Sequence, residues 1–177
     1  MNCSLGSEEE VIATLGKIEG VKEVHGILGM YDVIVQIESE NEEKIREIIT
    51  KTIRKIPKIR STMTLTRSES EEFFKTSEKL IGMMLGQNLA QAYVVIHCNK
   101  GEEYSTLKNL SHIPEVKEAD VVFGFYDVIC KIETIDNKAL ENITTKAIRK
   151  LPNIESSMTL NIINEQKQQN EKQQNDI

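Results

Sequence analysis

The polar residues best placed to bind a small molecule are two aspartates and a group of hydroxyl residues. Asp32 ends the motif GMYD at 29–32, and Asp127 ends the motif GFYD at 124–127. Strand alternation predicts that each aspartate shares one sheet face with an isoleucine and with hydroxyl side chains. The predicted hydroxyl residues are Thr62, Thr64, Ser157 and Thr159. A semi-polar face of this kind suits partial burial around a small polar ligand.

A structural interpretation of the same residues stays open. Threonine is a favourable strand residue, and an aspartate after a turn can serve only to hydrogen-bond nearby backbone. Gly29 and Gly124 are expected to supply a positive φ in their turns.

Other kinds of site have no support in the pattern. His25, His97 and His112 share no motif position, and no HxxxH or CxxC spacing occurs. Cys3 and Cys98 fall on an apolar strand, where buried thiols are expected. No phosphate loop, nucleophile elbow or acid–base pair is present. We therefore expect no metal site, no cofactor and no enzymatic activity.

An internal repeat determines how these residues are positioned. A gapless shift of 95 residues superposes Cys3 on Cys98 and continues to Arg67 on Ile162, with 27 identities in 65 pairs. The chain therefore contains two copies of one domain of roughly 70 residues, which is too few copies for a solenoid.

Each copy is predicted to run strand, helix, strand, strand, helix, strand. In copy two the periodicity indicates strands at 92–98, 116–123 and 126–133 and a helix at 102–112. In copy one Ser7 with Glu10 predicts a capping box, and Asn41 is a candidate N-cap of the second helix. This order predicts an α+β protein with two ferredoxin-like (βαββαβ) domains, each with a four-stranded antiparallel sheet.

The repeat also sets the expected boundaries. Copy one covers 1–67, a helical linker covers 68–91, and copy two covers 92–163. The polar tail 164–177 is predicted to be disordered. Because Met1 corresponds to Ile96, the first strand of copy one is expected to be truncated, and we expect a start a few codons upstream or another segment filling the gap.

Composition narrows the class of protein. The 177 residues contain 22 Lys and Arg against 28 Asp and Glu, a formal charge of −6, which disfavours autonomous binding to nucleic acid. No apolar run approaches the roughly 18 residues of a membrane span, and the N-terminus does not resemble a secretory signal. Three cysteines cannot all pair within one chain, so we expect a cytoplasmic protein.

The ordered set of motifs, found twice, resembles a known family. The GxYD hairpin, the IRKxP helix end and the SxMTL strand are similar to the effector-binding domain of the Lrp/AsnC transcription regulators, also called the RAM domain. The resemblance implies a ferredoxin-like fold, pairing through sheet faces, rings of dimers, and amino-acid effectors at domain interfaces. Its ligand region falls on the following residues: Gly29, Tyr31, Asp32, Thr62 and Thr64 in copy one, and Gly124, Tyr126, Asp127, Ser157 and Thr159 in copy two.

The chain departs from the family in one respect, because copy one begins at residue 1, where a regulator carries a helix-turn-helix domain. The resemblance therefore predicts a stand-alone tandem sensor of an amino acid or related metabolite, acting through protein partners without direct DNA or membrane binding. The alternative is a structural subunit that co-oligomerises with a full-length Lrp/AsnC regulator and binds no ligand. An enzyme on this scaffold is a third hypothesis.

Charge differences between the copies predict how they pair. Arg60 in copy one corresponds to Glu155 in copy two, and His25 corresponds to Asp120. Like charges facing each other across an interface are costly. Copy one is therefore expected to pair with copy two rather than with another copy one.

Overall fold

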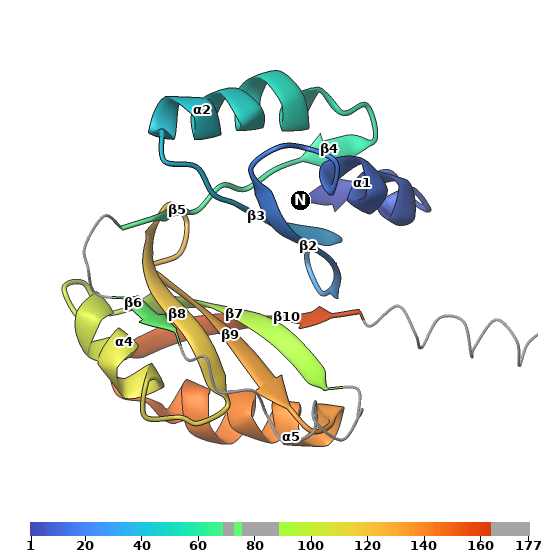
Figure 1. Cartoon of the computed structure of the whole chain (residues 1–177). Coiled ribbons are helices and arrows are strands. Elements are labelled where there is room, and N and C mark those ends of the chain that lie inside the picture. Colours follow the sequence, from blue (N-terminus) through green and yellow to red (C-terminus); the bar gives the residue numbers. More distant parts are fainter. Residues whose placement is uncertain (69–72, 76–88, 164–177) are drawn as a thin grey trace, which may run out of the picture. The chain divides into compact units, whose positions relative to one another are not determined.

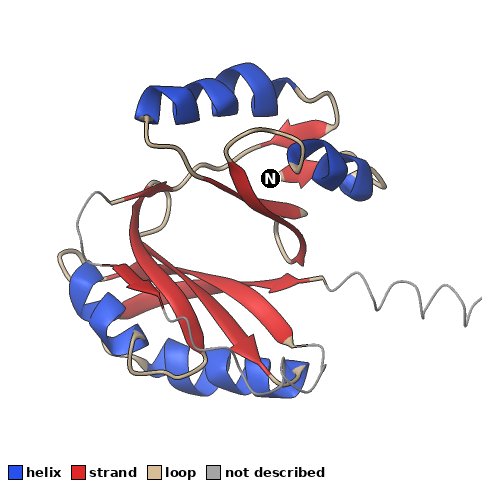
Figure 2. Ribbon diagram, in the orientation of Figure 1, coloured by secondary structure: helices blue, strands red, loops and turns tan. Residues whose placement is uncertain are grey.

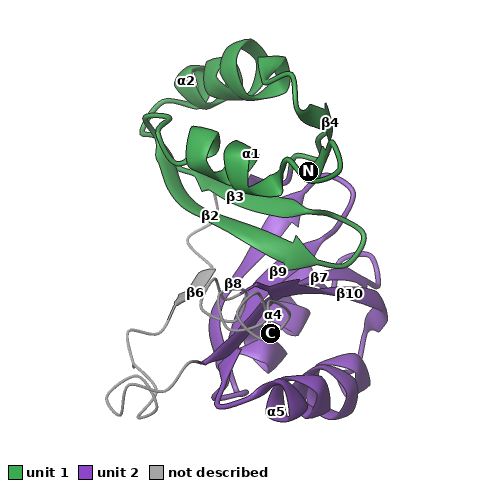
Figure 3. Ribbon diagram, turned by 90° about the vertical axis from the view of Figure 1, so that its right-hand side faces the viewer, with its two compact units in different colours: residues 1–64 green, residues 65–177 purple. Residues whose placement is uncertain are grey.

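The computed structural model describes residues 1–68, 73–75 and 89–163. The chain divides into two compact units, Met1–Thr64 and Leu65–Ile177, shown in green and purple in Figure 3. Each unit combines antiparallel strands with helices in the order predicted from the repeat (Figure 1), which confirms the α+β, ferredoxin-like fold class.

The second unit contains the complete fold. Its central sheet has the order β10-β7-β9-β8, so the first and third strands of the repeat lie in the middle. The strands are β7 (Ala90–Cys98), β8 (Val116–Phe123), β9 (Val128–Thr134) and β10 (Ile154–Ile162), and the helices are α4 (Glu103–Leu110) and α5 (Asn137–Asn142). Both helices cover the same face of the sheet (Figure 2).

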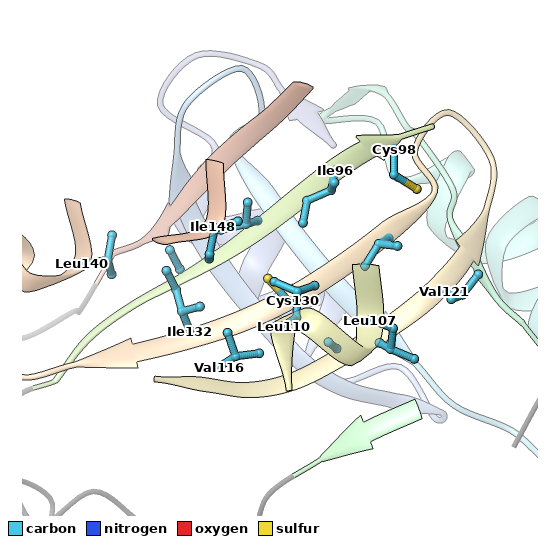
Figure 4. Packing of buried hydrophobic residues seen from close by; sticks show 14 of the residues in the cluster. Ile96, Cys98, Leu107, Leu110, Val116, Val121, Cys130, Ile132, Leu140 and Ile148 are labelled. Atoms are coloured by element: carbon cyan, nitrogen blue, oxygen red, sulfur yellow. The ribbon is translucent and has the colours of Figure 1, made fainter. Parts of the chain in front are cut away.

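Strict alternation along the central strands builds the core under these helices. Val94 and Ile96 of β7 pair with Cys130 and Val128 of β9, and all four side chains are buried. Leu110 of α4 is fully buried against this face (Figure 4). Burial of each such aliphatic side chain contributes about 1.5–3 kcal/mol, so this helix-covered face is the main source of stability in the unit.

Two short strands lie one after the other along the outer edge of β8. β5 (Thr66–Arg67) pairs with Val122 and Phe123, and β6 (Phe73–Lys75) pairs with Glu118 to Asp120. The expected linker helix over 68–91 is therefore wrong at 73–75, which are extended, and β7 already begins at Ala90. Residues 69–72 and 76–88 of that helix, and the tail at 164–177, lie outside the described residues.

The first unit has the same order of elements with a very short first strand. Its strands are β1 (Asn2–Cys3), β2 (Val21–Leu28), β3 (Val33–Ile37) and β4 (Ile59–Ser61), and its helices are α1 (Glu8–Leu15) and α2 (Glu42–Glu47). The predicted four-stranded sheet is wrong for this copy, because β1 pairs with β4 in a two-stranded sheet and β2 pairs separately with β3. β1 pairs with β4, and the Met1 carbonyl accepts hydrogen bonds from the backbone N–H groups of Asp32 and Val33 at 2.9 and 3.2 Å. The first strand of this copy is short, as predicted: β1 has two residues and its counterpart β7 has nine.

The predicted helix caps have different outcomes. The Asn41 side chain accepts a hydrogen bond from the Glu43 backbone N–H at 2.8 Å, as an N-cap should. Ser7 occupies the N-cap position of α1, but its hydroxyl donates to the Ser4 carbonyl at 2.6 Å and caps no helical N–H. The capping-box prediction is therefore wrong, because the preceding turn uses the hydroxyl.

The second helix of each copy ends in the same unusual way. α2 continues as a π-helical segment, Ile48–Thr52, and a 3-10 turn, Ile53–Lys55. α5 continues through Ile143–Ala147 and Ile148–Lys150 in the same sequence of turns. The wider turn followed by the tighter one brings the arginine of each IRK motif next to the last strand of its copy.

Among the described residues, no helix has both the length and the apolar character needed to cross a membrane.

Candidate functional site

The two aspartates of the GxYD motifs lie in the same place in both copies, at the start of the third strand. The backbone N–H of Cys3 donates to Asp32 Oδ2 at 2.7 Å, and the N–H of Cys98 donates to Asp127 Oδ2 at 3.0 Å. Among the described residues, Oδ1 of either aspartate accepts no hydrogen bond. Each carboxylate is therefore anchored through one oxygen and can receive a further donor through the other.

The hairpin turn before each aspartate depends on its glycine. Gly29 has φ 149° and Gly124 has φ 146°. Residues with a side chain rarely adopt this region, so the prediction of a positive φ at both positions is confirmed. The residues on either side of each glycine are large, apolar and mostly exposed: Leu28 and Met30 in copy one, and Phe123 and Phe125 in copy two.

In copy two the residues next to the aspartate form a cluster of three aromatic rings. The His97 ring lies 4.6 Å from the Tyr126 ring and 5.2 Å from the Phe125 ring, measured between centroids. Its Nδ1 lies 3.5 Å from Asp127 Oδ2. The residues of copy one that correspond to His97 and Phe125 are Asn2 and Met30. The two candidate sites therefore differ in polarity and in their capacity to stack on a ligand.

Tyr31 and Tyr126, which the repeat makes equivalent, also differ in their surroundings. Tyr31 is half-buried, and its hydroxyl donates to Met63 Sδ at 3.6 Å. Tyr126 is buried and contacts the aromatic rings beside Asp127.

The hydroxyl residues bind an arginine that the sequence analysis did not select. Arg54 Nε donates to Thr62 Oγ1 at 3.2 Å, and Arg149 Nε donates to Ser157 Oγ at 3.3 Å. Each arginine comes from the 3-10 turn that follows the π-helical segment. The identity of both IRK motifs under the 95-residue shift is the signal that could have found them.

The predicted sheet face of Ser157 and Thr159 is wrong. Ser157 pairs with Ile96 and Thr159 pairs with Val94, whose side chains form the core under the helices. The register shifts between Ile154 and Ser156, so that Glu155 is an extra residue in β10. A β-bulge of this kind reverses the alternation beyond it, which moves both hydroxyls to the helix side.

The same irregularity occurs in β4 of the first unit. Asn2 pairs with Ser61 and Cys3 pairs with Ile59, which makes Arg60 the extra residue. Among the described residues, no hydrogen bond or ion pair joins the aspartates to Thr62, Thr64, Ser157 or Thr159. Ligand binding by these hydroxyl residues stays a prediction.

The cysteines beside the aspartates are buried thiols. Burial, with the neighbouring Asp127 carboxylate, raises the pKa of Cys98 to about 11, and burial with Asp32 raises the pKa of Cys3. Burial alone raises the pKa of Cys130 to about 12. These groups stay protonated at neutral pH, which disfavours both nucleophilic and metal-binding roles. No group of three or more His, Cys, Asp and Glu in the described part of the chain could hold a metal ion.

Parts of this chain are similar in sequence to proteins of two Pyrococcus species. An uncharacterized HTH-type transcriptional regulator of Pyrococcus furiosus is 30% identical over 59 residues, which are 33% of this chain and 39% of that regulator. This chain therefore matches less than half of that relative. A solved structure of the hypothetical protein PHS023 from Pyrococcus horikoshii is 39% identical, covering 43% of this chain and 92% of that one, with a TM-score of 0.41.

A longer structural match concerns the fold alone. The siroheme decarboxylase NirDL aligns with 91% of this chain and 68% of its own, with a TM-score of 0.63 and 9% identity. The family model of the Lrp/AsnC ligand binding domain matches residues 2–70 and 91–171, which are most of the chain and follow the two copies of the repeat. Together with the doubled GxYD hairpin and its anchored aspartate, this match shows that the chain belongs to the Lrp/AsnC ligand-binding domain family.

Proposed function

We propose that this protein senses an amino acid or a related small metabolite and acts through protein partners, without catalysing a reaction. The proposed ligand contact in each copy is the carboxylate of Asp32 or Asp127. Membership of a ligand-binding domain family supports binding. The free thiols are consistent with the cytoplasm as its location.

The observation that carries the proposal is the repeated geometry of the aspartates. A backbone N–H fixes Oδ2 in both copies, while Oδ1 accepts no hydrogen bond from the described residues. The Asp127 side chain is 36% exposed, so that solvent and ligand can reach it. A purely structural aspartate needs only the first oxygen, and the second can accept a charge-assisted bond from a ligand ammonium.

The surroundings suggest that the two copies prefer different ligands. In copy two Phe125 is 64% exposed beside Asp127, and its ring can pack against an apolar or aromatic ligand side chain. In copy one the corresponding Met30 is 69% exposed, and its flexible side chain adapts to more shapes. We expect copy two to be the more selective site.

A thermal-shift screen of the twenty amino acids, followed by calorimetry of each hit, tests the proposal. Ligand at 100 times its dissociation constant should add about 2.7 kcal/mol to the free energy of unfolding. Asp127→Asn keeps a carbonyl acceptor for Cys98 but removes the charge, and should weaken binding by one to two orders of magnitude, which corresponds to about 1.5–3 kcal/mol. A matched Asp136→Asn variant, at the N-cap of α5, should bind normally. Full affinity in Asp32→Asn/Asp127→Asn would refute the assignment.

A second candidate function is an assembly subunit without its own ligand. It is favoured by the exposed apolar residues at both hairpin tips: Leu28, Met30, Phe123 and Phe125. Large exposed apolar groups often mark contacts between proteins. A flat ligand screen, combined with a molar mass by light scattering that falls in Met30→Ser/Phe125→Ser, would favour this function over sensing.

A further inference from the structure

The first unit carries a dense basic segment on a chain that is acidic overall. Residues 51–60 contain five Lys and Arg and no Asp or Glu, whereas the whole chain has a formal charge of −6. All five cationic residues are exposed. We call the four that follow Lys51 the basic edge: Arg54, Lys55, Lys58 and Arg60.

Within the part of the chain that the structure describes, the four cations of the basic edge have no acidic partner, whereas three other lysines of the unit have one. Lys22, Lys44 and Lys51 each form an ion pair with a glutamate. Among the described residues, none of the four cations of the basic edge forms an ion pair, and Arg54 alone makes a side-chain hydrogen bond, to Thr62. Their charge is therefore uncompensated within the described part of the protein.

The same segment contains a strand with one unpaired side. β4 forms a two-stranded sheet with β1, and no other described strand pairs with it (Figure 1). Lys58 comes just before β4, and Arg60 lies within it. An edge strand presents unpaired N–H and C=O groups to which an extended chain can add.

We propose that the basic edge and the free side of β4 form a docking site for an extended acidic segment of a partner protein. The partner adds as a strand beside β4, so that its backbone provides affinity while its carboxylates meet the four cations. This surface does not include the aspartate sites, and the proposal does not depend on effector binding.

The charge and composition of the unit favour a polypeptide over a nucleic acid. Specific DNA contacts commonly neutralise about 6–10 phosphates, and the basic edge has four cations on a chain of net negative charge. Tyr31 is the single Phe, Tyr or Trp among residues 1–64, so that a stacking platform for unpaired bases is lacking. A nucleic acid also has no peptide backbone that could pair with both the N–H and C=O groups of an edge strand.

The bulge and the charges of β4 determine which strands can add. Charged residues and bulges on edge strands normally discourage pairing with apolar or basic strands. Opposite charge in the incoming strand turns this repulsion into attraction. The corresponding segment of copy two has Asn153 and Glu155 in place of Lys58 and Arg60, so the preference is specific to copy one.

Fluorescence anisotropy on the full chain tests the proposal, with a labelled peptide of about eight residues alternating Glu and Val. The double variant Lys58→Asn/Arg60→Glu introduces the residues of copy two, and should lower the affinity at least about tenfold. Lys146→Asn/Lys150→Glu makes the same change of charge in the second unit and should leave the affinity unchanged. N-methylation of alternate peptide amides keeps the charge, blocks strand addition and should also weaken binding about tenfold.

Further comparisons separate the possible outcomes. A peptide that alternates Gln and Val should bind at least about tenfold more weakly than the acidic peptide. Raising the salt concentration from about 50 to about 200 mM should weaken the binding of the acidic peptide. Arg54→Gln/Lys55→Gln provides a second loss-of-charge variant if the first one unfolds in circular dichroism. The proposal would be overturned if both loss-of-charge variants bound the acidic peptide with the affinity of the parent protein, or if N-methylation left that affinity unchanged. It would also be overturned if the protein bound duplex DNA or phosphatidylserine vesicles more tightly than the acidic peptide.

Discussion

Asp32 and Asp127 each use one carboxylate oxygen to hold a neighbouring strand. Oδ2 accepts the backbone N–H of a buried cysteine in the neighbouring strand, and Oδ1 accepts no hydrogen bond from the described residues. The structural and the ligand-binding interpretations of these aspartates are therefore compatible. A substitution that removes both oxygens affects stability and binding together, and cannot separate the two roles.

The first prediction separates the stability effect from the charge effect. Asp127→Ala leaves the N–H of the buried Cys98 without its acceptor. This loss should lower the free energy of unfolding by about 1–3 kcal/mol. Asp127→Asn supplies a neutral acceptor for this N–H, so its free energy of unfolding should fall by less than that of the alanine variant. Urea denaturation measures both values, and Asp32→Ala provides a replicate in copy one. An alanine variant as stable as the parent would show that this hydrogen bond is dispensable.

The buried thiols predict how stability depends on pH. The pKa of Cys98 is about 11 in the folded protein, against an ordinary value of 9.0. Between these values the unfolded chain loses the thiol proton while the folded protein keeps it. The folded state then binds more protons, so the free energy of unfolding falls as the pH rises from about 9 to 11.

Urea denaturation at several pH values tests this second prediction. The parent protein should lose stability across that window, and Cys98→Ala should show a shallower decline because it lacks the titrating group. The comparison uses the slope with pH, since the substitution also changes packing. Equal slopes in the two proteins would contradict the raised pKa of Cys98.

At the scale of elements, short irregular segments determine which side chains meet. The extra residue in β10 turns Ser157 toward the helices, and the 3-10 turn after the π-helical segment delivers Arg149 to it. The first unit repeats this pair with Thr62 and Arg54. The recurrence in both copies indicates that the arginine and the hydroxyl fix the last strand to the helix end.

The β5–β8 pairing supplies the third prediction. Arg67 Nη2 of β5 lies 2.7 Å from Asp120 Oδ2, and the Asp120 side chain is 9% exposed. Asp120 Oδ1 is buried and has no hydrogen-bond partner among the described residues. Arg67→Ile introduces the residue found at the equivalent place in copy two, and removes the cation from this carboxylate. It should lower the free energy of unfolding by about 1–3 kcal/mol.

A double variant provides the control for this prediction. Asp120→Asn removes the buried charge, so Arg67→Ile should cost less in that background than in the parent protein. Thermal and urea unfolding give the two differences. Additive effects would show that the Arg67–Asp120 contact contributes nothing to the pairing of β5 with β8.

At the scale of the whole molecule, the net charge of the chain and its similarity to a transcriptional regulator lead to opposite expectations about DNA binding. The Pyrococcus furiosus relative is an uncharacterized HTH-type transcriptional regulator, whereas this chain has a formal charge of −6. The matched residues, 2–70 and 91–171, belong to the ligand-binding domain model.

The fourth prediction follows from this balance of charge. The isolated protein should show no sequence-specific DNA binding, because an acidic chain gains little from counterion release. A gel shift at low salt is the most demanding measurement, since low salt favours weak electrostatic binding. A complex that survives competitor DNA would contradict the prediction.

Much of the fold was predictable because its signals are local. The β-branched run at 92–98 and the tight turn that follows 116–123 predicted strands, and the structure has them at Ala90–Cys98 and Val116–Phe123. The N-cap role of Asn41 depends on a backbone N–H two residues away and was predicted correctly. Ser7 was predicted wrongly because two neighbouring segments compete for one hydroxyl, and its position does not show which one it serves.

The sequence by itself determined the two copies, their order of elements and the GxYD turns with their positive-φ glycines. Only the tertiary structure decided that each aspartate is anchored by a cysteine N–H and that Ser157 and Thr159 face the helices. The physical reason is that alternation and turn preference arise within a few residues. A bulge and a hydrogen bond between strands depend instead on the register of a neighbour distant in the chain.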